Sequence, residues 1–208
     1  MTEAIHDTTR IIGPLVLASG SPRRRQWMEA LNLPFEVQTP DVDETPIMDE
    51  DPENLVLRLA RTKAEVVSNR NPGRWVLAAD TTVAVDHHTL NKPVDVEDAV
   101  RMLMLLQGRA HQVHTGMALR RNRTVHSLVD TAQVFFRPFT EAQARWYVAT
   151  GEPMDKAGSY AIQGIGALFI ERVEGSFATV MGLPVERLAT WLFELDLLSD
   201  WVGLPKGR

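Results

Sequence analysis

The run WVLAADTTVAVD, residues 75–86, is apolar except for a polar centre that begins at Asp80. A short apolar run between turn residues predicts a buried strand. A carboxylate in such a strand is costly unless it holds a cation, accepts hydrogen bonds or activates a water. We place Asp80 at the end of an apolar strand, where ligands gather in α/β sheets. On this stretch alone, a structural role as a strand-terminating turn cap is about as well supported.

A second stretch, VLASGSPRRR at residues 16–25, predicts a strand that turns directly into a helix. Ser21 suits the N-cap and Pro22 the first helical position. Three arginines, residues 23–25, then fall at the helix end where free N–H groups already make the field positive, at a cost of roughly 0.3–1 kcal/mol per cation. The turn at residues 19–21 offers hydroxyl and N–H groups and is an anion pocket. We therefore interpret the arginines as anion ligands in preference to a solvated helix face.

The remaining chain mixes strands and helices, with no repeat of fixed period and no linker rich in Pro, Gly or Ser. This pattern predicts an α/β (mixed α+β) architecture. Strands are expected at 35–37, 111–119, 124–136 and 167–173. Helices are expected from 22 to near 32, at 54–68, from 95 or 97 to 106, at 140–150, and from 184 towards 198. Loops are expected at 41–51 and 87–93.

Composition excludes several functional classes. The 208 residues carry a formal net charge of −5, which argues against general nucleic-acid binding. The absence of cysteine excludes disulfides, thiolate zinc sites, iron–sulfur clusters and thiol nucleophiles. The polar start MTEAIHDTTR does not resemble a signal peptide, and no apolar run is long enough to span a membrane. We expect a soluble cytoplasmic protein whose anion site is a local cluster of cations.

Other charged residues stand beside predicted loops. Glu44 lies in an acidic loop, where solvation is the default interpretation, and Lys63 falls on a helix face with the same default. Lys92 precedes a proline, and Lys156 opens a glycine-rich segment. Gathered around one cleft, these cations would match a triphosphate.

Several familiar site motifs are absent. The sequence contains no G-x-x-x-x-G-K-[ST] loop, no H-E-x-x-H pair and no G-x-S-x-G elbow. His111 and His114 are three residues apart in a predicted strand and would point to opposite faces. We therefore do not expect a histidine metal site.

The blocks LASGSPRRR, RLARTKA, AADTTVAVD, NKPVD, GRAHQVHTGMAL, GEPMDKAGSYAIQGIG and GSFATVMGLP together resemble the Maf family of nucleoside triphosphate pyrophosphatases. The resemblance runs from about residue 15 to 190. It implies an elongated, mixed, twisted sheet flanked by helices, with two lobes and a central cleft, a Maf/ITPase-like fold that is often a homodimer. It also implies hydrolysis between the α- and β-phosphates, dependent on a divalent metal such as Mg²⁺ or Mn²⁺. We expect a flexible extension at 1–12, one Maf-like catalytic domain at 13–200 and a tail at 201–208.

The resemblance also implies roles for individual residues. Asp80 matches the proton acceptor for the attacking water, and Glu44 matches a cleft carboxylate that helps to hold the metal. The expected catalytic residues are Asp80, Lys92 and Glu44, and the expected metal ligands are Glu44 and Asp80. The expected substrate-binding residues are Ser19, Arg23, Arg24, Lys63, Thr81 and Gln163. No functional position of the family matches Arg25, which we expect to lie in solvent.

Three of these positions carry the expected selectivity. Arg23, Thr81 and Gln163 match the subgroup that acts on dTTP and UTP, and a glutamine offers both a donor and acceptors to a base edge. Modified pyrimidine nucleotides are a further expected substrate class. Departures from the family pattern occur at Asn91, Ala161 and Phe177, of which the last two could alter the base pocket. The alternatives are hydrolysis of 7-methyl-GTP and a non-catalytic, nucleotide-sensing role in regulating septum formation.

Overall fold

The computed structural model of the chain describes residues 14–86 and 88–197. The predicted extension at 1–12 and the predicted tail at 201–208 lie outside the described residues. The strands are β1 (Leu15–Leu17), β2 (Phe35–Val37), β3 (Val76–Val85), β4 (His88–Leu90), β5 (Ala110–Arg121), β6 (Thr124–Phe136) and β7 (Ile170–Glu174). The α-helices are α1 (Pro22–Ala30), α2 (Pro52–Arg70), α3 (Val96–Leu106), α4 (Glu141–Val148), α5 (Phe177–Val180) and α6 (Val185–Glu194). Three 3₁₀ turns are η1 (Glu152–Asp155), η2 (Ala157–Ser159) and η3 (Ile165–Phe169).

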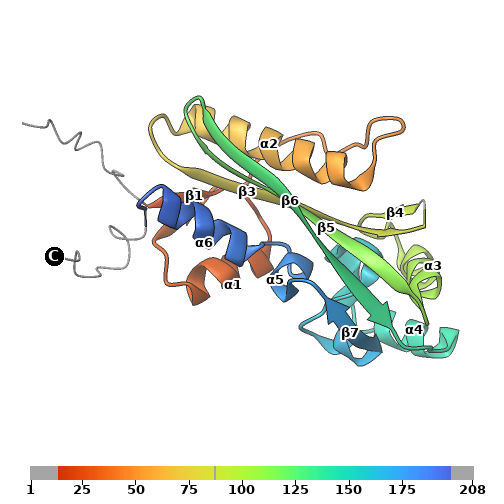
Figure 1. Cartoon of the computed structure of the whole chain (residues 1–208). Helices are drawn as coiled ribbons and strands as arrows, with labels where there is room; N and C mark the ends of the chain where they lie inside the picture. The colour runs from red at the N-terminus through yellow and green to blue at the C-terminus, as the bar shows by residue number, and fades with distance from the viewer. Residues whose placement is uncertain (1–13, 87, 198–208) are drawn as a thin grey trace, which may run out of the picture.

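The strands form one mixed sheet in the order β2-β1-β3-β5-β6-β7, with β4 also paired to β3 (Figure 1). β1 pairs in parallel with β2 and β3, and the other pairs are antiparallel. This architecture confirms the predicted mixed α/β class. No helix in the described part of the chain is both long and apolar enough to cross a bilayer.

β3 has one continuous edge and one interrupted edge. β5 follows the first edge from Val76 to Ala84. On the other edge β1 reaches Leu77, and β4 begins to pair at Val83. Between these two partners, no described strand pairs with that edge of β3. Asp80 lies in this gap, at the middle of the strand, so its predicted position at a strand end is wrong.

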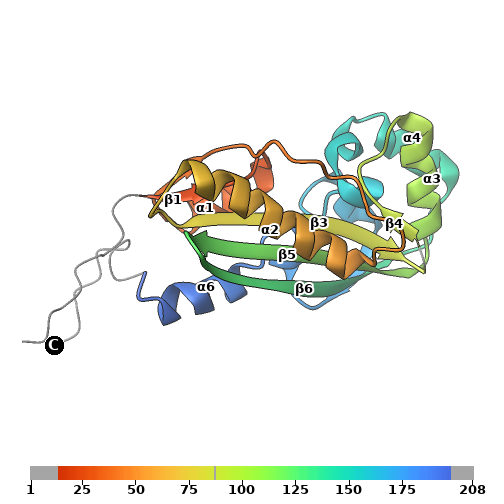
Figure 2. The same ribbon diagram turned by 90° about the horizontal axis from the view of Figure 1, so that it is seen from above.

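Helix α2 lies along one face of the sheet, over β3 and β5 (Figure 2). Small side chains allow the approach, since Ala60 and Ala64 of α2 pack against Ala78 and Ala118 of the sheet. At Gly116 on β5, any β-carbon would overlap the backbone of α2. The close contact fixes α2, and with it Lys63, over the gap in β3.

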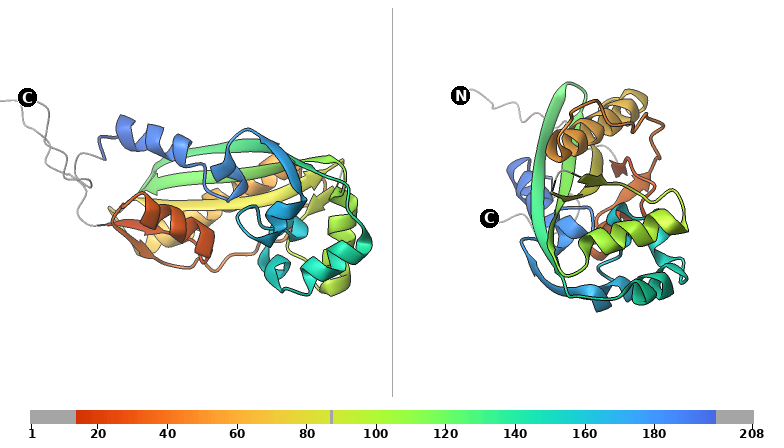
Figure 3. Two further views of the ribbon diagram at one scale, coloured as in Figure 1. Left: turned by 90° about the horizontal axis from the view of Figure 1, so that it is seen from below. Right: turned by 90° about the vertical axis from the view of Figure 1, so that its right-hand side faces the viewer.

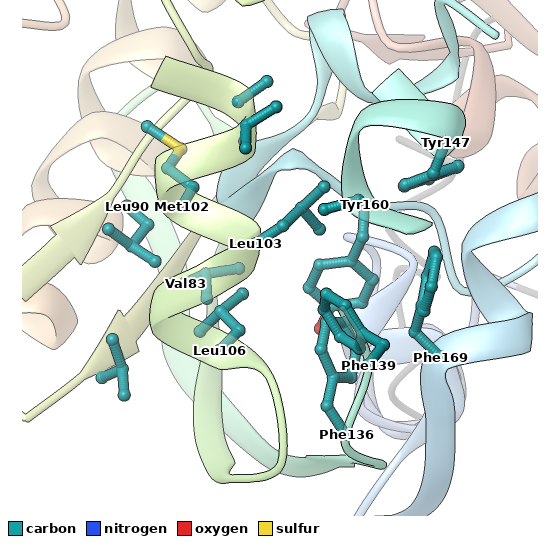
Figure 4. Packing of buried hydrophobic residues seen from close by; sticks show 14 of the residues in the cluster. Val83, Leu90, Met102, Leu103, Leu106, Phe136, Phe139, Tyr147, Tyr160 and Phe169 are labelled. Carbon is teal, nitrogen blue, oxygen red and sulfur yellow. The ribbon is translucent and has the colours of Figure 1, made fainter. Parts of the chain in front are cut away.

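Two larger cores occupy opposite ends of the molecule, and Figure 3 shows the elongated shape that results. One core joins β1, α1 and α6, around Met28 and Leu188. The other joins α3, α4 and the far halves of β3, β5 and β6. In this second core, aromatic rings from separate segments meet, among them Phe136, Tyr160 and Phe169 (Figure 4). The two cores are the two predicted lobes.

Several local predictions are wrong. The expected loop around His88 contains β4, and the strand expected from residue 167 begins only at Ile170, after η3. The short helix α5 was not expected. In each case tertiary pairing or packing overrides the local pattern. The last helix ends at Glu194, and residue 198, to which it was expected to extend after a break, lies outside the described residues.

Candidate functional site

A cleft of about 730 Å³ opens beside the gap in β3. Its walls come from the turn after β1, the first turn of α1, the buried face of α2, the centre of β3, the loop after β4 and the segment around η1 and η2. The nine residues expected to act in catalysis or substrate binding all line it: Ser19, Arg23, Arg24, Glu44, Lys63, Asp80, Thr81, Lys92 and Gln163. Arg25, by contrast, is exposed and does not line the cleft.

Lys63 connects two carboxylates at the centre of the cleft. Its Nζ lies 2.5 Å from Oδ1 of Asp80 and 2.7 Å from Oε1 of Glu44. The side chain of Asp80 is 13% exposed, whereas that of Glu44 is 55% exposed. Asp80 is therefore the sheltered member of the pair, and Glu44 faces the open side of the cleft.

The position of Lys63 follows from the pattern of α2. Leu55 and Leu59 lie four residues apart on the buried face of this helix, and Lys63 is the next residue in the same row. Lys63 is consequently buried, and the solvated face that its neighbours suggested is wrong for this residue. A buried ammonium needs anionic partners, which Asp80 and Glu44 supply.

The electrostatics of Glu44 reflect these cations. Partial burial alone would raise the pKa of Glu44, but the hydrogen bond from Lys63 and the charges of Lys63 and Lys92 outweigh it and lower the pKa. Glu44 is therefore ionised at neutral pH. Lys92 is exposed at the rim of the cleft, where its charge acts on Glu44.

The two carboxylates suit a hard divalent cation. One oxygen of each carboxylate, Asp80 Oδ1 and Glu44 Oε1, contacts the Lys63 ammonium, which leaves the second oxygen of each as a donor for a cation. No cluster of three or more His, Asp, Glu or Cys suitable for a metal occurs among the described residues. Magnesium ions are usually held by one or two carboxylates, with waters and substrate phosphates completing the shell. The donor set present fits that mode of binding.

The turn before α1 forms the second wall. Ser21 takes the N-cap position as predicted, but its side chain makes no cap hydrogen bond, and the first turn of α1 contains no acidic residue. The hydroxyl of Ser19 accepts a bond from the Ser21 N–H at 3.2 Å. The start of α1 therefore keeps its positive field beside the cleft, as an anion site requires.

Arg24 is held by three groups, two of which come from distant parts of the chain. Its Nε donates to the carbonyl of Gly182 at 2.7 Å, and its two terminal nitrogens donate to Ser19 Oγ at 3.2 Å and Thr81 Oγ1 at 3.0 Å. A guanidinium has five N–H donors. Three are engaged within the protein, and two remain for a ligand in the cleft.

The hydroxyl of Thr81 belongs to a directed chain of hydrogen bonds. Thr115 Oγ1 donates to the carbonyl of Thr179 at 2.8 Å, so its hydrogen is used there. In the 2.9 Å contact between Thr81 and Thr115, Thr81 must then be the donor. Thr81 therefore has no hydrogen left for a ligand, and its hydroxyl orients Arg24.

Arg23 and Gln163 lie near the Tyr160 side of the cleft. Both also line a small adjoining cavity of about 20 Å³, together with Tyr160 and Ala161. Arg23 Nε is buried and has no hydrogen-bond partner in the described part of the chain. Burial lowers the pKa of Arg23, and the charge of Asp155 partly opposes the shift. An unpartnered buried donor is costly for the protein alone, which favours a ligand role.

Comparison with known proteins identifies the family of the chain. The family described as Maf-like protein matches residues 14–195. The chain belongs to the Maf family. Relatives named dTTP/UTP pyrophosphatase include one from Myxococcus xanthus, 49% identical over 90% of this chain and 95% of its own, and one from Thermus thermophilus, 49% identical over 86% and 94%. A HAM1 protein of Coxiella burnetii shares the fold, with a TM-score of 0.52, 17% identity, and coverage of 88% of this chain and 100% of that one.

Departures from the Maf pattern have distinct places in the structure. Ala161 lines the small cavity beside Gln163, whereas Phe177 is exposed and outside the lining of the cleft. Asn91 accepts a hydrogen bond from the buried Thr82 at 2.9 Å. Two of the three departures therefore border the site, since Asn91 lines the cleft and Ala161 lines the small cavity beside it.

Three further groups that contribute to this Maf site were not predicted from the sequence. The carbonyl of Gly182 and the carboxylate of Asp155 act directly on the arginines of α1, and the hydroxyl of Thr115 acts on Arg24 through Thr81. Gly182 and Thr115 stand in family blocks, but a backbone carbonyl carries no signal in the side-chain pattern. Their roles follow only from the packing of α5 against β5.

Proposed function

We propose that this Maf protein is a nucleoside triphosphate pyrophosphatase that hydrolyses dTTP and UTP to the nucleoside monophosphate and pyrophosphate. The observation that carries the proposal is the cleft in which Lys63 joins Asp80 and Glu44 beside the uncapped start of α1. A cleft of 730 Å³ has the size of small-molecule sites. The relatives named dTTP/UTP pyrophosphatase support the choice of substrate.

In this proposal the cations of the cleft bind the phosphates. Arg24 offers two N–H groups, Arg23 offers its buried Nε, and Lys92 contributes an exposed charge at the rim. The N–H groups of the first turn of α1 add to the same field. Bound phosphates reverse the electrostatic penalty for arginines at a helix N-terminus.

Asp80 is the proposed general base. Lys63 engages Oδ1, which leaves Oδ2 to accept the proton of a water that attacks phosphorus. We propose that Glu44 and Asp80 also hold Mg²⁺ or Mn²⁺. That ion would supply Lewis-acid chemistry and lower the pKa of a water, which matters because an aspartate is a weak base.

A nucleotide panel tests the proposal. Pyrophosphate release is measured for dTTP, UTP, dCTP, CTP, dATP, dGTP and 7-methyl-GTP, with Mg²⁺ or Mn²⁺. We expect the highest kcat/KM for dTTP and UTP, and no release after chelation of the metal. A large excess of kcat/KM for 7-methyl-GTP would contradict the proposed substrate. Tight binding without hydrolysis would instead support a nucleotide sensor.

The proposal includes a cytoplasmic homodimer, as the resemblance to the family implies. Sedimentation of the purified protein tests the dimer, and cell fractionation tests the location. A monomer at micromolar concentration with full activity would contradict the first point.

A further inference from the structure

The loop that carries Gln163 is fixed by two side chains that do not line the cleft. Glu152, at the start of η1, accepts hydrogen bonds from the N–H of Ile165 at 2.9 Å and the N–H of Gly166 at 3.0 Å. It also accepts one from the hydroxyl of Tyr147 at 2.7 Å. One carboxylate thus fixes the backbone that follows Gln163.

Tyr147 fixes the backbone that precedes Gln163. Its hydroxyl accepts a bond from the N–H of Ala161 at 3.0 Å. Because an ionised carboxylate only accepts, the hydroxyl donates to Glu152, and both of its contacts have a defined direction. Tyr147 is fully buried on α4, and its ring packs against Phe169 in the aromatic core of Figure 4.

The charge of Glu152 is maintained by its partners. Burial alone would raise the pKa of Glu152, but the bonds from Tyr147, Gly166 and Ile165 outweigh burial and lower the pKa. Burial, with the neighbouring Glu152, raises the pKa of Tyr147, so the phenol stays protonated and continues to donate.

The loop wraps closely around these two groups. A β-carbon at Gly164 would overlap the carboxylate of Glu152. A β-carbon at Gly166 would lie 2.6 Å from the hydroxyl of Tyr147. The glycines of this segment are therefore required by the approach of the loop to Glu152 and Tyr147.

A fixed backbone around Gln163 bears on how the protein can distinguish one base from another by hydrogen bonds. The amide of Gln163 is exposed, and within the described part of the chain no hydrogen bond holds it. A free amide can rotate to match either thymine or cytosine, since it offers both a donor and an acceptor. Because Ala161 and Gly166 are held on either side, the Cα of Gln163 is fixed, and its amide can reach a base only in the orientations that this position allows.

We propose that Glu152 and Tyr147 are positioning residues that set the preference for thymine and uracil over cytosine, by fixing the loop around Gln163. The proposal rests on the function proposed above. It concerns selectivity, because neither side chain touches the cleft that contains Asp80.

The test uses Tyr147→Phe, which keeps the buried ring, and Glu152→Gln, which keeps the size of the side chain but places a donor among donors. The ratio of kcat/KM for dTTP to that for dCTP is measured for each variant. We expect the ratio to fall at least tenfold in both, with KM for dTTP changing more than kcat. Glu141→Gln, at an exposed position on α4, is the matched control and should keep the parent ratio.

A double-mutant cycle with Gln163→Ala tests whether Tyr147 affects selectivity through the loop that carries Gln163. If Tyr147 acts through this loop, Tyr147→Phe should lower the ratio no further in a Gln163→Ala background. Full additivity of the two losses, or an unchanged ratio in both Tyr147→Phe and Glu152→Gln, would overturn the inference alone. A parent enzyme that shows no preference for dTTP over dCTP would overturn the proposed function first, and the inference with it.

Discussion

Asp80 is the residue on which the proposed chemistry depends. Asp80→Asn keeps the shape but removes the proton acceptor, and it places an amide beside Lys63. We predict a fall in kcat of about 10²–10⁴-fold, the usual contribution of a general base. Pyrophosphate release under saturating dTTP measures it.

Asp86→Asn is the matched control, because Asp86 lies just beyond β3 and bonds to Arg109 at the surface. It should keep the parent rate, since exposed ion pairs contribute little. If Asp80→Asn hydrolyses dTTP as fast as the parent, the assignment of the base is wrong.

Thr115 offers a second test, away from any phosphate. Thr115→Val leaves the carbonyl of Thr179 without its buried donor and removes the acceptor for Thr81. A buried unsatisfied group costs roughly 1–3 kcal/mol, so we predict a Tm lower by several degrees. Because Thr81 also orients Arg24, we expect a higher KM for dTTP.

Thr115→Ser keeps the hydroxyl and should restore KM more fully than Tm. An unchanged KM in Thr115→Val would show that the chain of hydroxyls does not act on Arg24.

At the scale of elements, the close packing of α2 on the sheet fixes the distance between Lys63 and Asp80. Gly116→Ala places a methyl group where the backbone of α2 lies. Overpacking costs typically about 1–3 kcal/mol, so we predict a lower Tm together with weaker hydrolysis of dTTP. Thermal melting and a rate assay measure the two effects.

Gly20→Ala is the control for stability, because its added carbon would lie 3.5 Å from Thr39, an ordinary contact. Its Tm should stay near that of the parent. A Gly116→Ala protein with the parent Tm would mean that α2 can shift without loss.

The elements also show where sequence reasoning succeeds. The start of α1 at Pro22 and the hairpin of β5 and β6 follow from local signals, because proline fits the first helical turn and alternating strands flank a polar turn. β4 could not be predicted, since three residues gain strand structure only by pairing with β3. The burial of Lys63 could not be predicted for a similar reason, because burial of a cation depends on partners far away in the sequence.

For the whole molecule, His111 links stability to pH. Burial lowers the pKa of His111 to about 3, from an ordinary value of 6.5. Between these values the unfolded chain binds a proton that the folded chain does not. The free energy of unfolding should therefore fall as the pH drops, by up to about 1.4 kcal/mol per pH unit from this residue.

Between pH 6.5 and 5 the change in stability with pH comes mainly from the histidines, because this range lies above the ordinary pKa of the carboxylates. Burial also lowers the pKa of His114, so the test is the difference between proteins. Denaturant unfolding of His111→Gln should show a weaker dependence on pH than the parent. His88→Gln, at an exposed position on β4, should follow the parent curve. Equal slopes for His111→Gln and the parent would contradict the prediction.

The sequence by itself determined the mixed class of the fold, the strand and helix around the arginines, and the family. These features depend on local patterns and on the order of blocks along the chain. The nine predicted residues also share one cleft, as the blocks implied.

Only the tertiary structure decided how these residues act. It placed Asp80 in a gap between β1 and β4, joined it to Glu44 through a buried Lys63, and used the hydroxyl of Thr81 to orient Arg24. The reason is physical. The direction of a hydrogen bond and the burial of a charge depend on partners that the fold brings together from distant segments of the chain.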